Sequence, residues 1–256
     1  VLSRALNHAV WNEMIRSNPA TLTTLPRKTR KDIQTLTDAQ VQMFSALVEE
    51  DSYKAILKFI LFSGVRESEA IGLTWDCIDF ERGSIRIYHQ LLKRSKSEGG
   101  YTFASLKNDK ERLLTPPPML LSILKEQKVL QMQQRIKAGP AWKGWNSPEE
   151  QEKWFVFTTE LGDHYCPQTV YAHFKKIAKK IGAENANVHS LRHTYAVLCL
   201  QNGDDVKTVQ SNLGHATAAF TLDVYGHVSE KMKQDSADRM EAYIQNTVYG
   251  KKIQNR

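Results

Sequence analysis

The sequence predicts a mainly helical α+β fold, on three observations. Apolar residues recur at helical spacing through most of the 256 residues. One stretch, 77–118, changes to short apolar segments separated by turn residues, which is typical of strands. Hydrophobic residues make up 41% of the chain, the share of a globular protein with a substantial core. We therefore expect a mostly helical domain that carries a small antiparallel sheet.

Residues 1–34 are interpreted as the end of one helical unit followed by a linker. An apolar pattern at helical spacing runs from Leu2 to Ile15 and stops at Asn18-Pro19. A Thr- and Pro-rich stretch follows, and its basic end either crosses a phosphate backbone or is a solvated tether: Arg27, Lys28, Arg30 and Lys31. The chain opens inside the helical pattern at Val1 rather than at a Met, so we expect it to be part of a longer protein.

Residues 35–256 are expected to form the main domain, and its first helix has a clear start signal. Thr37-Asp38 is a typical N-cap before an amphipathic pattern. The later elements expected are helices over Tyr53–Phe62 and after Gly64, strands around turns at Arg82-Gly83 and Lys107-Asn108-Asp109, a strand at 154–158, helices from Met119 onward, and a last helix over Ser229–Ile244.

The overall charge favours a polyanionic partner. Lys and Arg number 35 against 28 Asp and Glu, a formal net charge of +7, and the pI is about 9.2. Cys77, Cys166 and Cys199 are odd in number and scattered, so we expect no disulfide framework and a reducing, cytoplasmic compartment. No apolar run is long enough to span a bilayer and no signal peptide opens the chain, so no membrane partner is expected.

The segment 189–228 combines basic side chains with one phenol and few carboxylates: His189, Arg192, His193, His215 and Tyr225. His189 and His193 are four residues apart, which is also a zinc-ligand spacing, but no Glu follows His189 and no third ligand stands at a usual spacing. A metal site is therefore disfavoured, and no cofactor is expected. Taken singly, His189 is most simply a helix-terminal residue and Arg192 a surface ion-pair partner.

Arg66, Glu69 and Lys107, upstream, extend this set to one that suits a reaction at a phosphate. Arginine presents a planar bidentate fork to phosphate oxygens and stays charged at any relevant pH. Histidines add hydrogen-bond donors, a phenol supplies an oxygen nucleophile without a metal, and a lysine can protonate a departing alkoxide. The sequence therefore predicts an anion site, with the phenol of Tyr225 as a side chain that suits a nucleophile.

Several segments occur in the order found in tyrosine recombinases, the lambda-type integrases: "GVRESEAIGLTW", "LKNDKERLLTP", "HSLRHTYA", "LGH" and "TLDVYGHV". From about Leu36 the chain resembles this family, and it is most similar to the integrases of Gram-positive conjugative transposons. The resemblance implies the catalytic domain of the family over 35–256, with a small three-stranded antiparallel sheet and a C-terminal tail helix within 229–256. Residues 1–34 then resemble the end of the family's core-binding domain and its basic linker.

The resemblance implies a site-specific DNA recombinase, an integrase or transposase of a mobile element. Such an enzyme cuts and rejoins strands through a 3′-phosphotyrosyl intermediate and a Holliday junction, without metal or ATP. Tyr225 would attack the scissile phosphate, and Arg66 and Arg192 would hold its non-bridging oxygens.

The remaining motif residues take supporting roles by the same resemblance. His189 would be the partner for the tyrosine proton, and His215 a donor to the phosphate. Lys107 would be the general acid for the 5′-oxygen, with Lys110 as the rival lysine. Glu69 would brace the site without reacting.

Double-stranded DNA, at transposon ends or attachment sites, is the expected partner. Contacts to its backbone are expected from basic residues of the linker and of the stretch 86–112: Arg27, Lys28, Arg30, Lys31, Arg86, Lys93, Arg94, Lys96, Lys110 and Arg112. The alternative interpretation of the stretch 86–112 is a solvated, charged face. The family also implies a homo-tetramer on DNA in which the C-terminal tail of each subunit docks on a neighbour; the alternative is that the tail packs on its own domain. An excisionase or a DNA-bending protein is expected as an accessory partner. The alternative functions are a type IB-like topoisomerase and a non-catalytic DNA-binding regulator.

Overall fold

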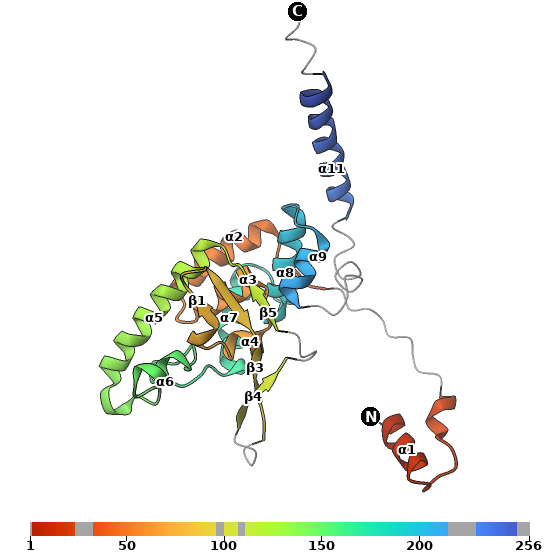
Figure 1. Cartoon of the computed structure of the whole chain (residues 1–256), viewed down its shortest axis with the longest axis vertical. Helices are drawn as coiled ribbons and strands as arrows, with labels where there is room; N and C mark the ends of the chain where they lie inside the picture. The colour runs from red at the N-terminus through yellow and green to blue at the C-terminus, as the bar shows by residue number, and fades with distance from the viewer. Residues whose placement is uncertain (1, 24–32, 96–99, 107–110, 215–228, 250–256) are drawn as a thin grey trace, which may run out of the picture. The chain divides into compact units, whose positions relative to one another are not determined.

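The structure, a computed structural model, covers the chain in two compact units, Val1–Asp32 and Ile33–Arg256 (Figure 1). It describes residues 2–23, 33–95, 100–106, 111–214 and 229–249. The predicted site residues Lys107, His215 and Tyr225 lie outside the described residues.

The first unit consists of helix α1 (Leu2–Trp11) and the short helix η1 (Pro19–Leu22). Asn18 ties the two together. Its amide nitrogen donates to the carbonyl of Ser3 at 2.9 Å and to the side chain of Asn7 at 2.6 Å, while its oxygen caps η1. The apolar pattern in the sequence continues to Ile15, but the helix itself ends at Trp11.

The second unit begins with helices whose ends follow from local sequence. Thr37 is the N-cap of α2 (Asp38–Leu47) and forms a capping box with Gln40, as its position predicted. The further helical elements are η2 (Val48–Glu50), α3 (Lys54–Ser63), α4 (Glu67–Ile71), η3 (Trp75–Cys77), α5 (Pro118–Ala138), η5 (Gly139–Ala141), α6 (Pro148–Glu152), α7 (Pro167–Lys180), α8 (Val188–Gln201), α9 (Val206–Leu213), α11 (Ser229–Tyr243) and the π-helical turn η7 (Ile244–Tyr249). The predicted tail helix corresponds to α11. Among the described residues, no helix is both long and apolar enough to cross a membrane.

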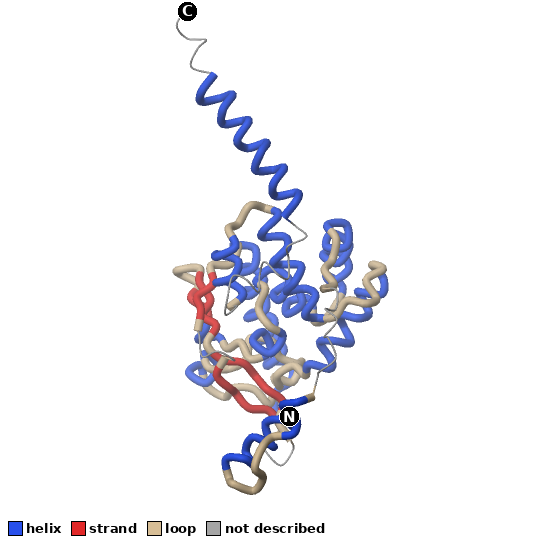
Figure 2. Tube along the Cα trace, turned by 90° about the vertical axis from the view of Figure 1, so that its right-hand side faces the viewer, coloured by secondary structure: helices blue, strands red, loops and turns tan. Residues whose placement is uncertain are grey.

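The strands form two small sheets. The predicted three-stranded antiparallel sheet is confirmed, in the order β1 (Ile78–Asp79), β2 (Ser84–Ile87) and β5 (Arg112–Leu114). A separate two-stranded hairpin, β3 (His89–Lys93) and β4 (Tyr101–Ser105), is inserted between β2 and β5. Figure 2 shows the strands beside the helices of this unit.

The strand predicted at 154–158 is wrong. This segment makes only isolated bridges, Thr74 with Phe155 and Thr158 with His164. The Gln131 amide on α5 donates to the carbonyl of Phe155 at 2.9 Å and to the hydroxyl of Thr158 at 2.8 Å. The side chain of Gln131 thus occupies a main-chain carbonyl, that of Phe155, which a continuous strand ladder would use.

Two apolar clusters position the site. The larger cluster surrounds α3 and includes Phe59, Phe157 and Leu191, all without exposed surface. A smaller cluster joins α8 to α9, with Val209 and Leu213 on α9 fully buried. Each large buried side chain contributes about 1.5–3 kcal/mol relative to an exposed one, so α9 is held firmly against α8.

Candidate active site

The chain enters the site through a tight turn between α3 and α4. Gly64 ends α3 in the left-handed conformation, with a φ of +66°. A Cβ atom on Gly64 would lie 2.3 Å from the ring of Tyr195 on α8, so a larger residue would clash there. Arg66, two residues after Gly64, is the N-cap residue of α4.

Glu69 closes the first turn of α4 onto Arg66. Its Oε2 accepts a hydrogen bond from the backbone nitrogen of Arg66 at 2.9 Å, and its Oε1 accepts one from Nη1 at 2.7 Å. The side chain of Glu69 is 1% exposed, whereas that of Arg66 is 27% exposed. Arg66 therefore lies at the boundary between the core and solvent.

Arg112 is buried in this site rather than exposed to DNA. Its Nη1 and Nη2 donate to the two oxygens of Glu69 at 3.2 and 2.5 Å, and its Nε donates to the carbonyl of Asn212 at 2.7 Å. Along β5, Arg112 and Leu114 are buried while Leu113 is exposed. The prediction that Arg112 contacts DNA is wrong, because this strand alternation turns its side chain inward.

Arg192 joins the ends of two other helices. From α8 its Nη1 donates to the carbonyl of Gly64 at 2.7 Å, and its Nη2 donates to the carbonyl of Leu213 at 2.6 Å. The residue is 2% exposed. A buried charge is tolerated when its donors are satisfied, as these two are.

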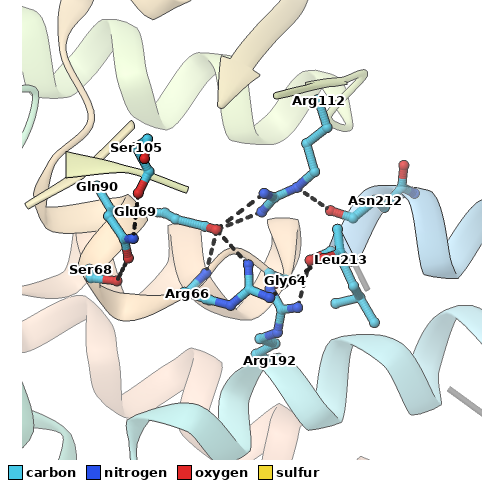
Figure 3. Close-up of polar contacts among 11 residues, drawn as sticks. Gly64, Arg66, Ser68, Glu69, Gln90, Ser105, Arg112, Arg192, Asn212 and Leu213 are labelled. Carbon is cyan, nitrogen blue, oxygen red and sulfur yellow. Dashed lines mark hydrogen bonds and ion pairs between the residues drawn. The ribbon is translucent and has the colours of Figure 1, made fainter. Parts of the chain in front are cut away.

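The carbonyl end of α9 is the meeting point of the cluster (Figure 3). Consecutive carbonyls there each accept a hydrogen bond from a different arginine: Asn212 from Arg112, Leu213 from Arg192, and Gly214 from Arg66 at 3.5 Å. The last carbonyls of a helix have no partner within it and carry the negative end of its dipole. The arginines therefore fix the chain directly before His215.

The carboxylate of Glu69 balances part of this charge. Burial alone would raise the pKa of the Glu69 carboxyl, but the hydrogen bonds and charges of Arg112 and Arg66 outweigh burial and lower the pKa to about 2. Glu69 is therefore ionised at neutral pH. With Arg192, the described part of the cluster carries two positive charges in excess, which suits an anion.

Two histidines on α8 lie beside the arginines. The rings of His189 and His193 meet edge to face, 4.6 Å between centroids. Burial, and then the charges of Arg192 and Arg66, lower the pKa of His189 to about 4. Burial also lowers the pKa of His193 to about 4. His189 keeps an exposed surface where water screens these charges, and its lowered pKa leaves the imidazole neutral at pH 7.

The β3–β4 hairpin docks on α4 through Gln90. The hydroxyl of Ser68 donates to Oε1 of Gln90 at 3.0 Å, and Nε2 of Gln90 donates to the carbonyl of Ser105 at 2.8 Å. Ser105 ends β4, two residues before Lys107. Neither a motif nor a charge marks Gln90 in the sequence, so this link was not predicted.

The remaining candidates for DNA contact fall into two groups: residues exposed on the structure and residues outside its described part. Arg86, Lys93 and Arg94 are exposed, and Arg86 pairs with Glu111 at 2.6 Å. Those outside the described residues are Arg27, Lys28, Arg30, Lys31, Lys96 and Lys110. Their contacts with DNA stay predictions. In the described part of the chain, no group of three or more His, Cys, Asp or Glu could hold a metal ion.

Known proteins resemble this chain over most of its length. Residues 34–232 match the Phage integrase family. A tyrosine recombinase XerC-like protein of Caldanaerobacter subterraneus subsp. tengcongensis is 28% identical over 252 residues, covering 93% of this chain and 63% of the relative. The ICEBs1 integrase of Bacillus subtilis is 25% identical over 256 residues, covering 94% of this chain and 63% of the relative.

A solved structure shows the same fold. The Tn1549 transposon integrase in complex with transposon right end DNA has a TM-score of 0.71 at 22% identity, covering 93% of this chain and 76% of that one. The chain spans 50% to 66% of the length of the first curated relatives it matches. The predicted resemblance to tyrosine recombinases is confirmed, and the chain belongs to the phage integrase family.

Proposed function

We propose that the chain is the catalytic part of a site-specific DNA recombinase, an integrase of a mobile element. It cuts and rejoins strands through a 3′-phosphotyrosyl intermediate and a Holliday junction. One observation carries the proposal: arginines from α4 and α8 converge on the carbonyl end of α9, directly before His215 and close in sequence to Tyr225. A positively charged cluster followed by a phenol suits a phosphodiester substrate.

In this proposal the arginines stabilise the pentacoordinate transition state. Negative charge builds up on the non-bridging oxygens, and guanidinium groups that are already in place need no reorganisation to meet it. Carbonyls of Gly64 and Leu213 orient Arg192, and Glu69 orients Arg66. Arg66 and Arg192 then hold the oxygens, while Glu69 braces the site.

The remaining residues move protons. A free tyrosine has a pKa of about 10, so the hydroxyl of Tyr225 must lose its proton as it attacks. His189, neutral at pH 7, accepts that proton. His215 donates a hydrogen bond to the phosphate. Lys107 protonates the departing 5′-oxygen. A phosphodiester is exchanged for a phosphotyrosine ester, so the strand is resealed without ATP.

The proposed partner is double-stranded DNA at transposon ends or attachment sites. Solved relatives support this: the Tn1549 integrase is in complex with transposon right end DNA, and the XerH recombinase is bound to its difH substrate. Lys93 and Arg94, exposed on the hairpin, are proposed to contact its backbone. Because the relatives are recombinases and integrases, a topoisomerase or a non-catalytic regulator is not favoured.

The wider assembly is also part of the proposal. Residues 1–34 would end a core-binding domain and its linker. Four copies would assemble on DNA through the tail helix α11, with an excisionase or DNA-bending protein as an accessory. These features follow the family resemblance.

The test is covalent capture of DNA. Duplexes taken from the DNA that flanks the gene, nicked near each candidate crossover, are incubated with the protein in EDTA and resolved on denaturing gels. A protein–DNA band that is absent with Tyr225→Phe is expected. DNA binding without such a band, for this chain and again for the full-length protein, would overturn the proposal in favour of a non-catalytic binder.

A further inference from the structure

Arg112 ties together elements that carry the proposed catalytic residues. Its guanidinium bonds Glu69 on α4 and the carbonyl of Asn212 at the end of α9 at the same time. We propose that Arg112 is a positioning residue for catalysis, which keeps the charge of Arg66 available to the phosphate and fixes the chain that leads into His215. This inference rests on the proposed recombinase activity.

The first step is electrostatic. Arg112 takes both oxygens of Glu69, at 2.5 and 3.2 Å, while Arg66 reaches that carboxylate through Nη1 alone among its guanidinium nitrogens. Without Arg112, the buried carboxylate would pair with Arg66 alone among the cations described here. The positive charge offered to a phosphate would fall, and charges interact strongly in such a low-dielectric site.

The second step is geometric. Nε of Arg112 holds the carbonyl of Asn212 at 2.7 Å, and its Nη1 lies 3.1 Å from where a Cβ atom on Gly214 would stand. The guanidinium of Arg112 therefore packs against Gly214, the residue that precedes His215. A displacement of about 1 Å at a reacting group can cost about 100-fold in rate, so a loose α9 end would be felt in catalysis.

A purely structural ion pair is the alternative. A buried ion pair is weak support for stability, but removing one partner destabilises a fold strongly. Loss of folding alone would lower every activity by the same factor. A positioning role instead predicts a loss that depends on the charge of the scissile phosphate, since Arg66 and His215, the residues that Arg112 would position, both act on that charge.

The experiment compares two suicide substrates under single-turnover conditions. One carries the normal scissile phosphate. The other carries a methylphosphonate there, in which a methyl group replaces one non-bridging oxygen and removes the negative charge. Wild type, Arg112→Gln, Arg112→Lys and the control Arg82→Gln are tested as the full chain. Arg82 is the control because its side chain, in the β1–β2 turn, is 86% exposed, whereas Arg112 is buried.

Arg112→Gln is expected to lose about 100-fold on the phosphate and clearly less on the methylphosphonate, with Arg112→Lys in between and Arg82→Gln unchanged. The ratio of the two rates within one variant is independent of the folded fraction. Equal losses on both substrates overturn the inference. If Arg112→Gln does not fold, the ratio for Arg112→Lys decides in the same way. Absence of a covalent band for wild type on the normal phosphate would instead count against the proposed function.

Discussion

Arg192 on α8 donates a hydrogen bond of 2.6 Å to the main-chain carbonyl of Leu213 at the end of α9. A residue proposed to hold the phosphate thus also holds the segment that leads to the proposed nucleophile. The same guanidinium bonds the carbonyl of Gly64, two residues before Arg66. Arg192 therefore joins α8 to the turn before Arg66 and to the end of α9.

Arg192→Ala is expected to reduce both stability and catalysis. Two buried carbonyls would lose their donor, which should lower the free energy of unfolding by about 2–4 kcal/mol. Cleavage should fall further than DNA binding, since the charge acts mainly in the transition state. Denaturant unfolding and covalent capture measure the two effects, and Arg82→Ala should change stability by no more than about 0.5 kcal/mol. Unchanged stability in Arg192→Ala would show that these buried contacts do not hold in solution.

Lys107→Ala is expected to lose about 10²–10⁴-fold in cleavage, the usual contribution of a general acid. A substrate with sulfur in place of the bridging 5′-oxygen should restore the rate. A thiol has a pKa near 8.5, so the departing thiolate needs no proton. Lys110→Ala is the matched comparison and should lose rate equally on both substrates. Rescue of Lys110→Ala, and not of Lys107→Ala, would transfer the proton-donor role to Lys110.

Features that depend on neighbouring residues were predictable from the sequence. Thr37 and Gln40 are three residues apart, so their capping box could be expected from composition and order alone. The tail helix α11 likewise follows from its own pattern. The order of the motifs predicted the family.

Features that depend on distant partners were not predictable. Arg112 lies 43 residues from Glu69 and 100 from Asn212 along the chain, so its sequence neighbourhood shows only a basic stretch. Arg112 and Leu114 share one face of the strand, but because Leu113 on the other face is apolar as well, the sequence does not show which face is buried. The false strand at 154–158 has the same cause, because its partner Gln131 comes from a helix.

The pH dependence of cleavage should reveal the low pKa of His189. A histidine base with an ordinary pKa near 6.5 would lose activity as pH falls through that value. Because the pKa of His189 is lowered to about 4, the neutral form persists, and no falling limb is expected between pH 7 and 5.5. Single-turnover cleavage and DNA binding, measured in parallel at each pH, check this. A limb near pH 6.5 that disappears in His189→Gln would contradict the proposed environment.

Glu67 provides a separate test of stability, next to Arg66 but outside the proposed chemistry. Its Oε1 is buried and has no hydrogen-bond partner among the described residues. Burial raises the pKa of this carboxyl to about 7, above the value near 4.3 of an unfolded chain. Stability from this group is therefore complete below pH 4.3 and is lost as pH rises through 7.

Glu67→Gln removes the charge that burial penalises and keeps the shape of the side chain. The variant should gain stability over wild type, by on the order of 1 kcal/mol at pH 8 after allowance for partial exposure, and by less at pH 5. Urea unfolding at both pH values measures the difference. Glu81→Gln, at an exposed position, is the control and should show the same small effect at either pH. A gain for Glu67→Gln that is equal at pH 5 and pH 8 would mean that the carboxylate of Glu67 is hydrated in solution, since only a dehydrated carboxylate makes stability fall as the pH rises.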